Sequence, residues 1–300
     1  MTQSTEDATR RYRGMDGWPV PDILNALWNG QMQAVAACYP ALPALAEAVT
    51  RATERLAGGT GRIVYSGAGS SGVIAALDGV DLGSTFDWPD DRVLILLAGG
   101  LDLAAGLAPE AEDSDELGRR LAGDHAIRSS DVVVGVSASG NSPFTTAIVD
   151  EARQRGALSI ALTSVPGSPL ANAADHVLAV ATGAEVLAGS TRLGAGTAQK
   201  VMLNLFSTAL MTGLGCVYDN LMVNLRPDNA KLRRRALAIV TDIARADETE
   251  AAKALERQGD VKRAILDLAG VARADIPALL AASGGSLRKA LEAAKAHRKA

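Results

Sequence analysis

Residues 131–145, with the sequence DVVVGVSASGNSPFT, decide the fold of this chain. The β-branched run 132–136 predicts a buried strand, which ends in a loop of small and hydroxyl residues. Pro143 then stands where the first turn of a helix is expected, because the N–H that proline lacks would have no partner there. This order of strand, hydroxyl-rich loop and helix N-terminus is typical of an α/β unit that binds an anion.

The loop itself predicts a phosphate site. Ser137, Ser139, Ser142 and Thr145 supply hydroxyl groups, and Gly140 lets the backbone approach a ligand closely. The alternative is an ordinary strand-to-helix turn in which one serine caps the helix. A cap needs one hydroxyl, whereas this loop has four within nine residues. Phosphate binding is therefore the favoured interpretation.

The sequence around this loop repeats the alternation of strand and helix. Further strands are expected at 62–66, 93–97, 158–162 and 176–180, with helical segments between most of them. Continuous apolar strands that alternate with helices indicate a parallel sheet covered on both faces. We therefore expect an α/β protein with a doubly wound, mostly parallel five-stranded sheet.

A second glycine- and serine-rich loop follows the first expected strand. It contains Gly69, Ser70 and Ser71, and a short helix is expected after it at 73–77. Ligands of such sheets bind at the carboxyl ends of the strands, so both loops fall at the same edge and can converge on one ligand.

A third segment, GSTRLGAGTAQK at 189–200, is also rich in small and hydroxyl residues and opens a long helix that runs to about residue 214. Glu185, Ser190 and Arg192 are the polar residues expected to face a site there. The alternative is a solvated loop whose glycines serve as turn residues.

The remaining sequence predicts helical additions at both ends. Residues 1–60 are expected to form an N-terminal helical segment that packs on the core, and 61–240 the sheet domain. Residues 245–300 contain short helical patterns at 247–258, 260–268 and 275–282, which predict a small helical C-terminal subdomain.

Composition excludes several classes of function. A formal net charge of −4 and an aromatic content of 3% argue against general nucleic-acid binding. Neither a signal peptide nor a membrane-spanning segment is expected, and Cys38 and Cys216 are interpreted as buried thiols of a cytoplasmic protein. The three histidines have no ligand spacing, so no metal site is expected.

Several segments in the same order together resemble the N-acetylmuramic acid 6-phosphate etherases, a family built on the sugar-isomerase (SIS) domain. They are GRIVYSGAGSSG, AGG followed by EAED, DVVVGVSASG, GAEVLAGSTRLGAGTAQK and NLMVNL with NAKL after it. The related glucokinase regulatory protein shares this pattern. The resemblance covers roughly residues 5–240, and the tail is similar to the family's small C-terminal bundle.

The resemblance implies a carbon–oxygen lyase that converts N-acetylmuramic acid 6-phosphate into N-acetylglucosamine 6-phosphate and D-lactate. It implies no metal or organic cofactor, and a homodimer with sites near the interface. Carboxylates suit this chemistry, because a base must remove the acidified C2 proton and an acid must protonate the departing lactate before water adds.

The resemblance also implies roles for two acidic residues. Glu112 matches the family's second catalytic glutamate, the base at C2, and Asp81 stands where the first glutamate, the acid, is expected. Val73 and Gly194 stand where the family usually has an arginine and a lysine. Without the resemblance, solvated surface acids would be the simpler interpretation of both carboxylates.

Two other functions fit the same segments. One is a non-catalytic regulator that binds a phosphosugar, and the other is an isomerase or lyase of changed specificity on the same fold. An isomerase needs only one base at C2. A transcriptional regulator is disfavoured, because no basic helix-turn-helix pattern precedes the sheet.

Overall fold

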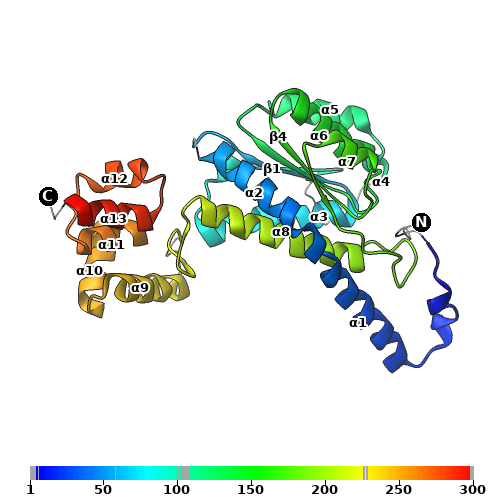
Figure 1. Ribbon diagram of the computed structural model, residues 1–300, viewed down its shortest axis with the longest axis horizontal. Coiled ribbons are helices and arrows are strands. Elements are labelled where there is room, and N and C mark those ends of the chain that lie inside the picture. Colours follow the sequence, from blue (N-terminus) through cyan, green and yellow to red (C-terminus); the bar gives the residue numbers. More distant parts are fainter. Residues whose placement is uncertain are drawn as a thin grey trace. The chain divides into compact units, whose positions relative to one another are not determined.

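A computed structural model describes residues 5, 7–57, 59–100, 102, 109–225, 227 and 229–297 of the chain (Figure 1). The chain forms two compact units. The first comprises Met1–Val80 and Asp91–Ser207, and the second comprises Asp81–Asp90 and Thr208–Ala300.

The first unit is built on a five-stranded sheet in which every neighbouring pair of strands is parallel. The strands, in spatial order, are β2 (Val93–Leu97), β1 (Ile63–Gly67), β3 (Val132–Val136), β4 (Leu158–Thr163) and β5 (His176–Ala179). Every residue of β1, β3 and β4 is buried, as expected for apolar strands covered on both faces. The predicted parallel sheet is therefore confirmed.

Helices cover both faces of this sheet (Figure 1). One face packs against α5 (Asp115–Asp124), α6 (Pro143–Gln154) and α7 (Pro169–Ala173), with Val64, Val133, Phe144 and Ile148 in the shared core. The other face contacts α2 (Leu42–Leu56). This doubly wound arrangement leaves the carboxyl edge of the sheet to the loops.

Strand register brings the two glycine- and serine-rich loops to one edge. Gly67, the last residue of β1, pairs with Val136, the last residue of β3, and Val136 pairs in turn with Leu162 of β4. The loops after β1 and β3 therefore leave the sheet side by side, as predicted from the chain order.

Helix α3 (Gly69–Phe86) is much longer than the predicted segment 73–77. The prediction was too short because glycines interrupt the apolar pattern. Two of them lie where the helix packs closely on the sheet. A Cβ on Gly72 would overlap the Leu97 side chain, and one on Gly79 would lie 3.0 Å from the Tyr65 ring. Here glycine permits close packing of the helix and does not end it.

The N-terminal part contains two short 3₁₀ turns (Arg10–Tyr12 and Met15–Gly17) and helix α1 (Val20–Ala37) before α2. Helix α8 (Gly194–Gly213) is the predicted long helix, and it begins in the last part of the chain that belongs to the first unit. The end of α8 agrees with the sequence expectation to within one residue, and α1 and α2 lie in the segment expected to be helical.

The second unit is a bundle of short helices. Its helices are α9 (Ala230–Ala244), α10 (Glu248–Gln258), α11 (Val261–Leu268), α12 (Ile276–Ala282) and α13 (Leu287–His297). A small hairpin, β6 (Val217–Tyr218) with β7 (Leu221–Met222), precedes them. Val240, Ile265, Ile276 and Leu287 lie in a common buried core, so α9 packs with the later helices. The three predicted helices are confirmed as α10, α11 and α12, and α9 and α13 are additions to them.

Cys38 and Cys216 are both free and buried, as predicted. Among the helices that the structure describes, none combines the length and the apolar character needed to cross a membrane.

Candidate functional site

The loop between β3 and α6 uses its hydroxyl groups to hold its own backbone. Ser137 Oγ accepts a hydrogen bond from Gly140 N–H (3.1 Å), and Ser139 Oγ accepts one from Asn141 N–H (3.2 Å). Ser142 Oγ caps α6 by accepting from Thr145 N–H (3.3 Å). A hydroxyl that accepts in this way still has its hydrogen to donate. Ser142 Oγ donates its hydrogen to the Glu112 carbonyl oxygen (3.5 Å), whereas the Ser137 and Ser139 hydroxyls have no acceptor within the described residues.

Gly140 and Thr145 of the same loop are closely packed. Gly140 has φ +68°, and a Cβ on it would overlap Ser168 Oγ, so any side chain there would be strained. Thr145 is fully buried, and its Oγ1 lies 3.0 Å from Ser142 Oγ. Ser142 is buried as well, so this contact holds the two side chains together inside the loop.

The loop after β1 is tied to α8. Ser71 Oγ accepts a hydrogen bond from Gln199 Nε2 (3.0 Å), and both residues are buried. Gly69 and Ser70, at the start of α3, are half-buried. Sequence reasoning missed Gln199, because nothing in a helical pattern distinguishes an inward-facing glutamine from a solvated one.

Glu112 lies between these two loops. It ends the short helix α4 (Pro109–Glu112) and is half-buried. Its Oε2 is 3.8 Å from where a Cβ on Gly69 would stand, and its carbonyl oxygen is 3.5 Å from Ser142 Oγ. Burial raises the pKa of the Glu112 carboxyl, and the negative charge of Asp113 raises this pKa further. The structure therefore brings Glu112 together with Gly69 and Ser142.

Asp81, the other carboxylate assigned from the resemblance, belongs to the second unit, whereas Glu112 belongs to the first. It is exposed on α3, and its carbonyl oxygen accepts a hydrogen bond from Ser84 Oγ (3.3 Å). Its role as the acid stays a prediction.

Glu185 is buried as the cap of a helix. Its two carboxylate oxygens accept hydrogen bonds from Gly194 N–H (2.9 Å) and Ala195 N–H (2.8 Å), the first residues of α8. A Cβ on Gly194 would stand 3.1 Å from Glu185 Oε2, so the glycine leaves room for this close cap. The negative carboxylate also suits the positive end of the helix dipole. Nearby, Ser190 is half-buried and Arg192 is exposed.

A buried acid that sequence reasoning missed lies deeper in the first unit. Asp78 of α3 accepts hydrogen bonds from Tyr65 Oη (2.8 Å), Asn204 Nδ2 (3.2 Å) and Ser207 Oγ (3.1 Å). Burial raises its pKa, although these donors oppose the rise. The network joins β1, α3 and α8, and thereby fixes the two helices whose first turns border the site.

No group of three or more histidine, cysteine, aspartate or glutamate side chains that could hold a metal ion occurs within the described residues.

The fold and the site together define an SIS-domain protein: parallel strands, hydroxyl-rich loops at their carboxyl edge and a glutamate between them. The family model for the SIS domain matches residues 110–209, which include Glu112 and the loop after β3. Among solved structures, a phosphoheptose isomerase from Francisella tularensis is 20% identical, with a TM-score of 0.49, and the match covers 65% of this chain and 100% of that one.

Relatives that match nearly the whole chain identify the family within this class. The N-acetylmuramic acid 6-phosphate etherase of Burkholderia lata is 43% identical over 290 residues, 96% of this chain and 95% of the relative. The protein of the same name from Streptomyces coelicolor is 43% identical over 298 residues, 98% of this chain and 94% of the relative. The chain belongs to the N-acetylmuramic acid 6-phosphate etherase family.

Proposed function

We propose that this protein is a lyase that cleaves the D-lactyl ether of N-acetylmuramic acid 6-phosphate, giving N-acetylglucosamine 6-phosphate and D-lactate. The observation that carries the proposal is the place of Glu112, a half-buried carboxyl with a raised pKa between two hydroxyl-rich loops. A carboxyl of raised pKa is a stronger base than an ordinary glutamate once it is ionised, which suits proton abstraction from carbon.

In the proposed reaction the hydroxyls of Ser137, Ser139 and Ser142 hold the phosphate of the open-chain sugar. Glu112 removes the proton from C2, which the neighbouring aldehyde acidifies, and the C3–O bond then breaks to leave a C2=C3 double bond. The departing lactate takes a proton from an acid, a role that the family resemblance assigns to Asp81. Water finally adds its hydroxyl to C3 and a proton to C2.

A homodimer is part of the proposal. Helix α1 exposes a line of large apolar side chains at spacings of three or four residues, which places them on one face of the helix. They are Val20, Leu24, Trp28, Met32 and Val35, with exposed fractions of 41–66%. Such a continuous apolar face marks an interaction surface, and a second copy of the chain is the partner proposed for it.

The setting proposed is the cytoplasm, where the two buried thiols stay reduced.

Light scattering after size exclusion tests the dimer. Trp28→Asp places a charge in the middle of the apolar face and is expected to convert the dimer to a monomer. Gln33→Glu adds the same charge at an exposed position on another side of α1 and should leave the dimer intact. A wild-type monomer, or a Trp28→Asp dimer, contradicts this part of the proposal.

A D-lactate release assay with N-acetylmuramic acid 6-phosphate tests the function. The wild-type protein is expected to release one D-lactate per substrate consumed, and Glu112→Gln should release almost none. A folded wild-type protein that binds the substrate without releasing lactate would instead support the regulator interpretation and overturn the lyase.

A further inference from the structure

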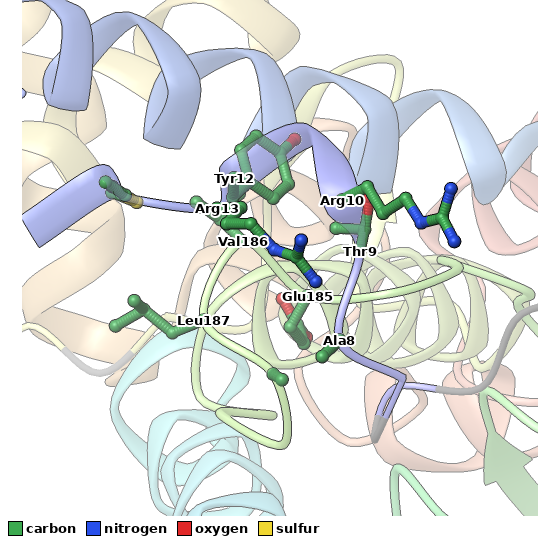
Figure 2. A pocket seen from close by; sticks show the side chains of 10 residues that line it. Ala8, Thr9, Arg10, Tyr12, Arg13, Glu185, Val186 and Leu187 are labelled. Carbon is green, nitrogen blue, oxygen red and sulfur yellow. The ribbon is translucent and has the colours of Figure 1, made fainter.

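A cavity of about 310 Å³ lies between the N-terminal arm (residues 8–15) and the segment 185–188 of the first unit (Figure 2). Just before the arm, the Thr5 carbonyl oxygen accepts a hydrogen bond from Gly189 N–H (2.9 Å), which anchors the chain next to the segment 185–188. The lining includes polar and aromatic side chains as well as aliphatic ones. Its polar and aromatic members are Thr9, Arg10, Tyr12, Arg13 and Glu185.

The cavity offers positive charge that is not paired. Arg10 and Arg13 are both exposed, and neither forms an ion pair within the part of the chain that the structure describes. The acid in the lining, Glu185, is buried and its two oxygens are bound by the first N–H groups of α8. In Figure 2 the guanidinium of Arg13 points toward Glu185 and Val186, while that of Arg10 points away from them.

Helix α8 links the cavity to one loop of the candidate site. Glu185 caps α8 at Gly194, and Gln199 of the same helix binds Ser71 in the loop after β1. Gly194 and Gln199 are five residues apart, which is about 7.5 Å along a helix axis. The cavity lining and the loop after β1 are therefore both fixed to the first turns of the same helix.

We propose that this cavity binds the carboxylate of the ether substituent, with Arg13 as the principal cation and Arg10 as the second. This inference rests on the proposed function. The substrate of that reaction has two anionic groups, a phosphate and a carboxylate, and the hydroxyl-rich loops supply donors for one of them. Arginine suits the second, because its planar fork of N–H groups matches a carboxylate.

With this assignment, the cavity is the part of the protein that distinguishes the substrate from the product. N-acetylglucosamine 6-phosphate has the phosphate and no carboxylate, so it would gain nothing from Arg13. Tight binding of the substrate and weak binding of this product follow from the same arginine.

Calorimetric binding of two ligands to three variants tests the inference. The ligands are N-acetylmuramic acid 6-phosphate, in a Glu112→Gln background that prevents turnover, and N-acetylglucosamine 6-phosphate. The variants are Arg13→Gln, Arg10→Gln and, as the matched control, Arg11→Gln. Arg11 lies in the same turn but outside the cavity lining, and its guanidinium stacks on Tyr12, 5.5 Å from the ring centroid.

Arg13→Gln is expected to weaken binding of the carboxylate-bearing ligand about tenfold or more, the loss typical of one charge-assisted hydrogen bond. Its affinity for N-acetylglucosamine 6-phosphate should not change. Arg10→Gln should have a smaller effect in the same direction, and Arg11→Gln should have none. Equal losses for both ligands, or no loss with Arg13→Gln, would overturn the inference.

The result of this binding experiment can be distinguished from the result of the D-lactate release assay. If wild-type protein releases no lactate but Arg13→Gln still selectively weakens the carboxylate-bearing ligand, the lyase proposal fails and the cavity assignment stands. If lactate is released and the selectivity is absent, the cavity assignment alone fails.

Discussion

Two carboxylates lie near opposite ends of the strands of the same sheet, and they differ in how many hydrogen bonds they accept. Asp131, just before β3, has a fully buried side chain and accepts hydrogen bonds from Arg62 N–H (2.9 Å), Arg62 Nη2 (2.6 Å) and Arg128 N–H (3.1 Å). Glu112, at the carboxyl edge, is half-buried, and its carboxylate accepts no hydrogen bond from any residue that the structure describes.

The pKa values of these two carboxyl groups are shifted in opposite directions. Burial by itself would raise the pKa of Asp131, but the hydrogen bonds from Arg62 and Arg128 outweigh it and lower that pKa. At Glu112 burial and the charge of Asp113 act together, and its pKa is raised. A carboxylate whose oxygens are all bound stabilises the fold, whereas one kept without partners remains available for proton transfer.

The largest effect is expected from Glu112→Gln. Loss of a general base typically costs about 10²- to 10⁴-fold in rate, so D-lactate release should fall by that order. Because the pKa of Glu112 is raised in the folded state, its charged form is disfavoured there at neutral pH. The variant should therefore unfold at the same temperature as the wild type or a higher one. An active variant, or one with a much lower melting temperature, would remove the distinction between the two acids.

Asp131→Asn should show the reverse behaviour. Removing one partner of a buried ion pair costs about 3 kcal/mol in the free energy of unfolding, while lactate release per folded molecule should be unchanged. The lowered pKa of Asp131 means that its stabilisation is present above the ordinary aspartate pKa of about 4 and is lost as the pH falls through the lowered value. Urea unfolding at neutral and acidic pH checks this, since the difference from wild type should shrink in acid.

A pair of serine variants separates the capping of a helix from the binding of a phosphate. Ser142 and Ser114 cap α6 and α5 in the same way, so Ser142→Ala and Ser114→Ala should each lower stability by about 1 kcal/mol. Only Ser142 lies in the proposed phosphate loop. Ser142→Ala alone is therefore expected to weaken binding of N-acetylglucosamine 6-phosphate. Equal affinities for the two variants would place the phosphate elsewhere.

The smallest expected effect concerns the pH profile. Asp113→Asn removes a negative charge that raises the pKa of Glu112, so this pKa should fall. A base with a lower pKa is ionised at lower pH, and the acidic limb of kcat/KM should move to lower pH. Asp115→Asn is the control, because Asp115 pairs with Arg119 and does not contribute to the shift of Glu112. A limb that moves equally in both variants would point to general charge effects.

The sheet and its loops could be predicted because their signals are local. The apolar runs at 93–97 and 132–136 fix strand boundaries almost to the residue, and the parallel order places the following loops at one edge. The extent of α3 was underestimated because glycine is a weak helix former in isolation. Its glycines are tolerated because Leu97 and Tyr65 pack against them.

The site could be predicted only in part because some roles depend on contacts between distant segments. Glu185 was expected to face a site, but its hydrogen bonds to the first turn of α8 could not be predicted from the sequence. Asp78 looks like one polar residue on an apolar helix until Tyr65 and Asn204 are brought to it. The cavity lined by Arg10 and Arg13 exists because the N-terminal arm lies against a segment far along the chain.

Running the reaction in D₂O and in H₂¹⁸O shows whether Glu112 removes the C2 proton in an elimination that is followed by addition of water. Mass spectrometry and NMR of the N-acetylglucosamine 6-phosphate product then locate the label. Solvent deuterium at C2 and solvent oxygen at C3 are expected in every product molecule, with almost no labelled product from Glu112→Gln in the same time. Product that keeps its original C2 hydrogen would contradict this mechanism.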